Sequence, residues 1–367
     1  MSTGREIVKR LLVGFSLMAC VGAMHASHAF EVEPMGRLHL DYAAHDADRR
    51  PMDDGFYLRR ARLGLRGKFD DHWSFEVEYD FVGHGAYKNV SLQYEGWKPG
   101  AINLGQFKVP FGLAAMTSSN NLLFIERALP AETFAPSRRL GVGIERNRDR
   151  YTVAVMGFGR SIDDRDDAHG AGARFTWTPF ASDDTVVHLG LGAMTERPRG
   201  DVKVSARPES RVADVKLVNT GDLDGVDRVD RWGLEAAFRS GPLLVQAEWI
   251  EAEILRDAGT GDASVGGWYV AGSWIVTGES RKYKHGTFKG VTPNRRGGAL
   301  ELTARYSHLD LDDGDVRGGT ERNATLGLNY YLTGHLRFMV NYIDVRSRRR
   351  GTSDDPDILL LRAQAMF

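Results

Sequence analysis

The chain has 367 residues, a length that fits two globular domains or one large barrel. Its 42 glycines and 10% aromatic residues are typical of a protein with many turns and exposed rings. A formal net charge of -1 excludes a globally basic nucleic-acid binder. Any electrostatic function must therefore depend on where the charges lie and not on their sum.

Residues 1–29 are predicted to be a signal peptide, so that the mature domain spans residues 30–367 outside the cytoplasm. Lys9 and Arg10 precede an apolar stretch, residues 11–21, that is too short for a spanning helix, and residues 27–29 form a small-x-small cleavage site. The only cysteine, Cys20, lies in this segment, so we expect no disulfide in the mature chain. A lipoprotein signal ending at Cys20 is the alternative.

Beyond the signal peptide, apolar and polar residues alternate with period two, as in residues 73–81 and 299–309. This pattern fits either a half-solvated soluble sheet or a membrane barrel with a wet interior. Sixteen strands are predicted near 35–45, 56–68, 72–82, 88–97, 101–108, 140–146, 151–158, 171–178, 185–195, 230–239, 242–254, 265–277, 299–309, 321–332, 335–346 and 357–367.

The lengths of the connections favour a transmembrane barrel. Short turns follow most even-numbered strands, whereas the connection after strand five and residues 196–229 are about thirty residues or longer. Short turns on one rim and long loops on the other are typical of outer-membrane barrels, and the final apolar Phe367 resembles their C-terminal signal. Residues 277–298 break the rule, because this long basic segment falls on the short-turn rim. The predicted fold is an all-β, transmembrane antiparallel β-barrel of about 16 strands.

The connection between strands five and six, the third loop, has an unusual composition for a surface loop. Apolar residues such as Phe111, Leu113, Phe124 and Ile125 need shelter from water, while its basic residues need a wet environment. We therefore expect a loop that folds into the barrel, with its apolar side against the wall and its polar side toward the lumen.

Several long motifs in this chain resemble the phosphate-selective porin O and P family. They read GQFKVPFG, ERALP and FAPSRRLGVGIE around the third loop, then GWYVAGSWIVTGESRKY, GALELTARYSHLDL, TLGLNYYL and RFMVNYI. The resemblance implies a trimeric barrel in the bacterial outer membrane, with an anion-favouring constriction. It also implies an anion site made of an arginine after the first strand's glycine, here Arg37, and a pair on the second strand, here Arg59 and Arg60.

Two positions depart from the family pattern. Asn120 stands where phosphate-selective members carry a lysine after Thr-Ser-Ser, and Lys88 stands where they carry an acidic residue. The site would stay cationic but rearranged, so anion preference is a safer expectation than phosphate specificity.

Further basic residues complete the predicted site: Arg127, Arg138 and Arg139 at the constriction, and Arg207 and Arg211 in the outer vestibule. A solvated surface loop is the alternative for the last two. On the second strand we expect most basic residues to pair with Glu76, Glu78 and Asp80, leaving Arg59 and Arg60 free to meet solute.

The predicted function is a passive, water-filled, anion-preferring channel for phosphate, polyphosphate or other small anions. We expect outer-membrane lipid as its surroundings, a homotrimer, no nucleic-acid partner, no cofactor and no metal. A sugar-permeable or general porin is one alternative, although most aromatic residues fall on the lipid-facing phase. An outer-membrane hydrolase using His188, His285 or His308 is the other.

Overall fold

The computed structural model describes residues 30–163, 168–257 and 260–367. The predicted signal peptide and Cys20 lie outside the described residues. No helix in these ranges is long and apolar enough to cross a membrane.

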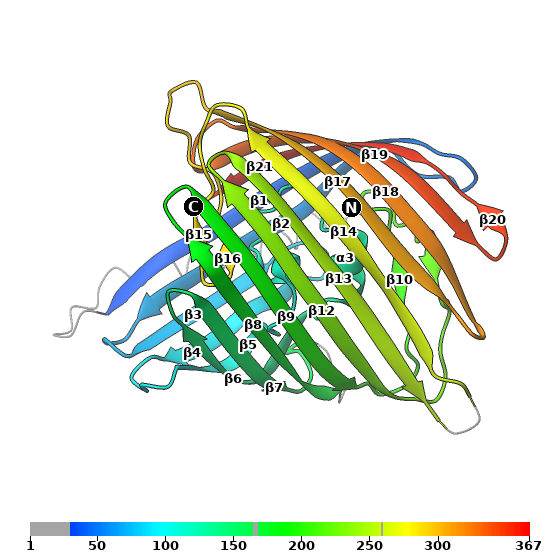
Figure 1. The fold of residues 1–367 in the computed structure, drawn as a ribbon, viewed down its shortest axis with the longest axis horizontal. Coiled ribbons are helices and arrows are strands. Elements are labelled where there is room, and N and C mark those ends of the chain that lie inside the picture. Colours follow the sequence, from blue (N-terminus) through cyan, green and yellow to red (C-terminus); the bar gives the residue numbers. More distant parts are fainter. Residues whose placement is uncertain (1–29, 164–167, 258–259) are drawn as a thin grey trace.

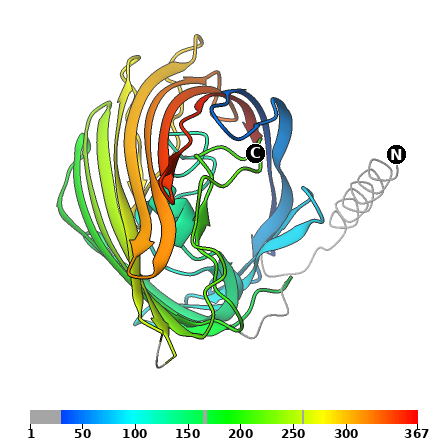
Figure 2. The same ribbon diagram turned by 90° about the vertical axis from the view of Figure 1, so that its right-hand side faces the viewer.

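Within the described ranges the chain forms one closed barrel of sixteen antiparallel strands (Figure 1). The strands are β1 (Glu31–Asp46), β2 (Gly55–Lys68), β3 (Trp73–Asp80), β4 (Ala86–Tyr94), β5 (Ala101–Lys108), β6 (Arg138–Asn147), β7 (Tyr151–Phe158), β8 (His169–Ala181), β9 (Thr185–Arg197), β12 (Val226–Ser240), β13 (Leu243–Arg256), β14 (Ala263–Ile275), β17 (Ala299–Asp313), β18 (Val316–Tyr331), β19 (Leu336–Arg349) and β21 (Asp357–Met366). All sixteen predicted strands are therefore confirmed, and their ends differ from the expected ones by a few residues. The first and last strands, β1 and β21, pair in antiparallel register and close the ring (Figure 2).

The remaining elements are short and belong to the connections. The third loop, residues 109–137, carries helices α2 (Leu113–Met116) and α3 (Leu129–Phe134). The fifth loop, residues 198–225, carries β10 (Ser205–Ala206) and β11 (Val218–Asn219). The hairpin of β15 (Tyr283–Lys284) and β16 (Thr287–Phe288) lies in the connection after β14, and β20 (Thr352–Ser353) pairs with the end of β19.

The alternation places apolar side chains on the outer surface and polar ones inside. On β19, Phe338 and Tyr342 are 43% and 46% exposed, whereas Arg337 and Asn341, which directly precede them, are each 1% exposed. Since neighbouring side chains of a strand point to opposite faces, one surface meets lipid while the other builds the interior.

The third loop folds into the barrel, as predicted, and its helix α3 lies inside the ring of strands (Figure 2). Its apolar side chains are buried against the inner face of the wall, where they form one cluster with Ile250 and Ile254 of β13 and Leu309 of β17. The cluster includes Val109, Phe111, Leu113, Leu123, Phe124, Leu129 and Phe134 of the loop.

The long turn, residues 276–298, also folds back into the barrel instead of staying at the periplasmic exit, where its basic residues were expected. Arg281 is buried and forms a bidentate ion pair with Glu301 of β17, with Nη2 2.7 Å from Oε2. Its Nη1 donates to the carbonyl of Asn121, 3.1 Å away, so the long turn contacts the third loop directly.

Replacing Arg281 by Ala should leave the buried Glu301 without its main partner. We expect a loss of about 3 kcal/mol in the free energy of unfolding, because an uncompensated buried charge is costly. Urea unfolding in detergent micelles measures this loss. The exposed neighbour provides the control: Lys282→Ala should leave the unfolding midpoint unchanged.

Candidate functional site

The third loop is held by side chains that reach inward from the last strands. The carbonyls of Asn120, Leu122, Leu123, Ile125 and Glu126 accept hydrogen bonds of 2.6 to 3.1 Å. The donors are Gln364, Arg337, Asn329, Arg362 and Arg305, respectively. Because this stretch has no regular secondary structure, its buried carbonyls need such donors.

One predicted site residue, Arg127, and the basic residue Lys108 have a structural role in the same loop. Arg127 donates to the carbonyls of Ala114 and Thr117, at 2.8 and 3.0 Å. Lys108, at the end of β5, donates from the other side to the carbonyls of residues 115–117. Both cations therefore satisfy the end of α2, and the expectation that Arg127 lines the constriction receives no support from these contacts.

Arg59 is not free for solute, contrary to the sequence expectation. Its guanidinium makes a bidentate ion pair with Glu126 of the third loop, at 2.6 and 3.0 Å. Arg362 of β21 shares this carboxylate at 3.0 Å and also pairs with Asp41 of β1 at 2.6 Å. Arg59 thus joins the loop to the wall.

Two β-bulges bring additional charged side chains to the inner face. The register of β1 and β2 shifts after the pair His39 and Arg60, so that Arg59 is an extra residue on β2. The register of β3 and β4 shifts opposite Glu78, where both Lys88 and Asn89 lie on β4. A bulge turns two consecutive side chains toward one side of the sheet, which alternation alone forbids.

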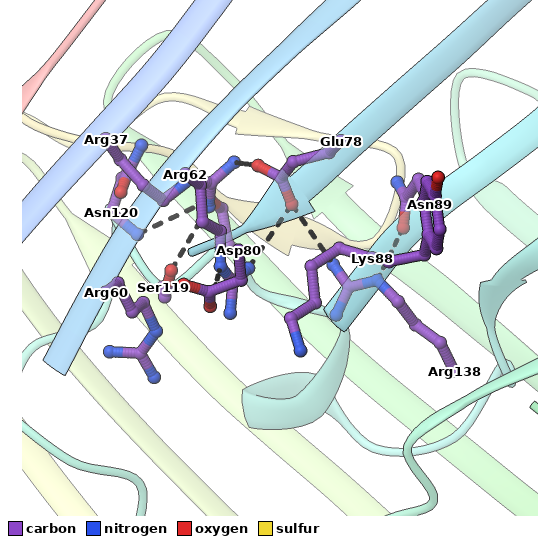
Figure 3. Close-up of polar contacts among 12 residues, drawn as sticks. Arg37, Arg60, Arg62, Glu78, Asp80, Lys88, Asn89, Ser119, Asn120 and Arg138 are labelled. Atoms are coloured by element: carbon purple, nitrogen blue, oxygen red, sulfur yellow. Dashed lines mark hydrogen bonds and ion pairs between the residues drawn. The ribbon is translucent and has the colours of Figure 1, made fainter. Parts of the chain in front are cut away.

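A basic cluster results on the inner face of β1 to β6 (Figure 3). It consists of five cations, Arg37, Arg60, Arg62, Lys88 and Arg138, with the two carboxylates Glu78 and Asp80 among them. Glu78 lies 2.6 Å from Arg37 and 3.3 Å from Arg62, and Asp80 lies 2.7 Å from Arg62. Arg138 donates to Asn89 at 2.5 Å, and Arg37 donates to Ser119 of the third loop at 3.1 Å.

Lys88 and Arg60 differ from the other members of the basic cluster. Within the described residues, neither Lys88 nor Arg60 forms a salt bridge (Figure 3). Lys88 is half-buried, whereas Arg60 is only 3% exposed and has His39 as its hydrogen-bond partner, at 3.2 Å. Asn120 contacts the other ring nitrogen of His39 at 3.1 Å. The predicted residues Arg37, Arg60, Lys88, Asn120 and Arg138 therefore do come together.

The other predicted residues lie apart from this cluster and have carboxylate partners. Arg139 shares Glu196 with Arg231, at 2.7 and 2.9 Å. In the fifth loop, Arg207 pairs with Asp214 and lowers the pKa of that carboxyl. Arg211 pairs with Glu132 of α3. The first contact lies within the fifth loop, and the second joins the fifth loop to the third. Both vestibule arginines therefore have a carboxylate partner.

An open cavity of about 450 Å³ lies beside the third loop, along the inner wall from β1 to β7. Its lining includes Arg66, Glu76, Asn89, Lys108 and Glu145. The opposite half of the barrel is filled by the third loop and the long turn. This cavity thus lies along the strands that carry the basic cluster, and Asn89, the partner of Arg138, is part of its lining.

The three histidines of the hydrolase alternative lie on different elements. His188 is buried between Tyr283 and Glu235, at 2.7 and 3.1 Å, and His308 lies near the ring of Trp268. His285 lies at the tip of the β15–β16 hairpin. No group of three His, Cys, Asp or Glu side chains suited to a metal ion occurs in the described parts of the chain.

Sequence reasoning missed His39 and Arg362. His39 lies two residues after Arg37 on the same face of β1, a spacing that could have indicated it. Arg362 lies on the inward phase of β21, but its partners, Asp41 and Glu126, are remote in sequence and gave no local signal.

Comparisons with known proteins agree with this architecture. The family model described as phosphate-selective porin O and P matches residues 32–367. Porin O of Pseudomonas aeruginosa is 26% identical, over 90% of this chain and 87% of that protein. A protein of Caulobacter vibrioides without an assigned function is 28% identical, over 84% of this chain and 67% of the relative.

Solved structures show the same fold at low identity. The trimer form of OmpT of Vibrio cholerae has a TM-score of 0.62 at 14% identity, covering 92% of this chain and all of that one. An anion-selective porin from Comamonas acidovorans has a TM-score of 0.60 at 13% identity, with the same two coverages. With the family match over nearly the whole barrel, the chain belongs to the phosphate-selective porin O and P family and is a porin of the bacterial outer membrane.

Proposed function

We propose that this porin is an anion-preferring channel whose selectivity is set by the basic cluster, and that phosphate is among its solutes. The observation that carries the proposal is the basic cluster (Figure 3): Arg37, Arg62 and Arg138 contact the carboxylates of Glu78 and Asp80, while Arg60 and Lys88 form no salt bridge among the described residues. Positive charge at a narrow aqueous passage raises the local anion concentration and repels cations. The names of the family and of Porin O support phosphate as a solute.

Phosphate carries up to two negative charges at neutral pH, so it gains more from the cluster than chloride does. Lys88 is the group best placed to meet it, because the residue is half-buried and its ammonium forms no salt bridge among the described residues. Polyphosphate would extend the same interaction over several groups. A sugar pore needs lumenal aromatic rings for sugars to slide over, whereas Phe111, Phe124 and Phe134 of the third loop are buried against the barrel wall.

Planar-bilayer recordings test the proposal. The purified protein should show a chloride-over-potassium permeability ratio above one, and phosphate should inhibit the chloride current in a saturable manner. A preference for potassium would contradict the channel's proposed selectivity. Selectivity without phosphate inhibition would restrict the proposal to small anions in general.

Lys88→Ala should weaken the inhibition by phosphate roughly fivefold, the effect of about 1 kcal/mol, because one partly solvated charge is removed from the site. The concentration of phosphate that halves the chloride current measures the effect. Lys98→Ala, on the exposed turn after β4, is the control and should keep the wild-type value. Equal inhibition in both variants would remove Lys88 from the phosphate site.

Glu78→Gln should raise the chloride-over-potassium permeability ratio. Glu78 is 1% exposed and contacts both Arg37 and Arg62. A neutral amide in its place removes one negative charge, so the net positive charge of the basic cluster increases. The reversal potential in a potassium chloride gradient measures the ratio. Glu253→Gln, on the exposed outer face of β13, should not shift it.

We also propose that the protein forms a homotrimer through the wall of short strands. Strands β3, β4, β5 and β7 have eight or nine residues, whereas β8 to β19 of the barrel have thirteen or more. The short wall exposes Val77, Tyr87 and Leu92 on its outer surface. The trimeric form of a fold neighbour supports the stoichiometry. Native mass spectrometry from detergent should give three times the chain mass; a monomer mass would contradict the trimer.

A further inference from the structure

Arg60 is an unusual buried charge. It is 3% exposed, and its Nε has no hydrogen-bond partner. Among the described residues no carboxylate forms a salt bridge with it. Glu126 binds Arg59 and Arg362, and Asp41 binds Arg362. Burying a guanidinium without a carboxylate is costly, so its retention points to a function for the uncompensated charge.

The partner that Arg60 does have is a neutral group. A guanidinium can only donate hydrogen bonds, so Nδ1 of His39 must accept from Nη1 of Arg60, 3.2 Å away. The proton of the imidazole then lies on Nε2, which donates to Oδ1 of Asn120 at 3.1 Å. This tautomer is neutral. His39 therefore orients Arg60 without cancelling its charge.

Asn120 acquires a role through the same contact. Its side-chain oxygen accepts from His39, and its carbonyl accepts from Gln364 of β21 at 3.1 Å. An amide at this position fixes the imidazole in the tautomer that Arg60 requires. A lysine in its place would present an ammonium, which cannot accept the proton of Nε2.

We propose that His39 is a positioning residue for anion selectivity: through its neutral imidazole, fixed by Asn120, it holds the uncompensated charge of Arg60 beside the anion path. The proposal rests on the anion-preferring function of the basic cluster and names the group that orients one of its charges. In this arrangement Asn120 contributes to selectivity through Arg60 and not through direct contact with phosphate.

The test replaces the acceptor of Arg60 in two ways in the full-length porin. His39→Glu supplies a carboxylate that pairs with Arg60 and cancels its charge. His39→Gln supplies a neutral amide that can accept from Arg60 and donate to Asn120. Arg60→Gln gives the reference for complete loss of this charge.

The chloride-over-potassium permeability ratio, measured from reversal potentials, should fall about threefold to tenfold in His39→Glu and to a similar extent in Arg60→Gln. His39→Gln should stay within about twofold of the wild type, because a neutral acceptor remains. If His39→Gln loses as much selectivity as His39→Glu, the residue is merely structural and the proposal is overturned. A wild-type ratio in His39→Glu overturns it as well.

A variant in the third loop tests the same relay without altering any charge. Asn120→Leu removes the acceptor of Nε2, so the imidazole can turn away from Arg60, and the ratio should fall about twofold to threefold. An unchanged ratio in Asn120→Leu contradicts the role of Asn120. These outcomes are separate from failure of the proposed function, which would show in the wild-type channel as a ratio of one or below.

Discussion

The interior of this barrel depends on hydrogen bonds from wall side chains to the backbone of the third loop. A buried loop without regular secondary structure has carbonyls that cannot reach water, and leaving them unpaired would be costly. Here Arg337, Arg362 and Arg305 supply donors from three different strands. Since these guanidiniums point inward, the loop has a defined position, and an open cavity lies beside it along the inner wall from β1 to β7.

The same constraint explains why so many predicted arginines do not face solute. Arg59 is expected at the pore because of the family resemblance, and Arg127 because it is a basic residue of the third loop. In the fold, Arg59 neutralises Glu126, and Arg127 satisfies the carbonyls of α2. Around Glu78 and Asp80, by contrast, the basic residues outnumber these two carboxylates, and Arg60 and Lys88 form no salt bridge among the described residues.

The barrel, its strand number and the inward path of the third loop could be predicted because alternation and connection length are local properties of the sequence. On the part of β13 that the third loop covers, the usual pattern of apolar residues outside and polar residues inside is reversed. There Ile250, Ala252 and Ile254 face inward, whereas Glu251 and Glu253 face outward near the rim. The inward side is apolar there because the loop covers it. Salt-bridge partners such as Arg362 and Glu126 could not be predicted, since they are 236 positions apart.

The anchoring of the third loop has a consequence for biogenesis. Its donors come from β17, β18, β19 and β21, which follow it in the chain, and the bond from Arg362 to Ile125 spans 237 positions. Contacts this remote form late, because a long segment must be ordered before they are gained. The barrel therefore acquires its finished lumen only when the last strand joins the first, and a nascent or truncated barrel would be leaky and unselective.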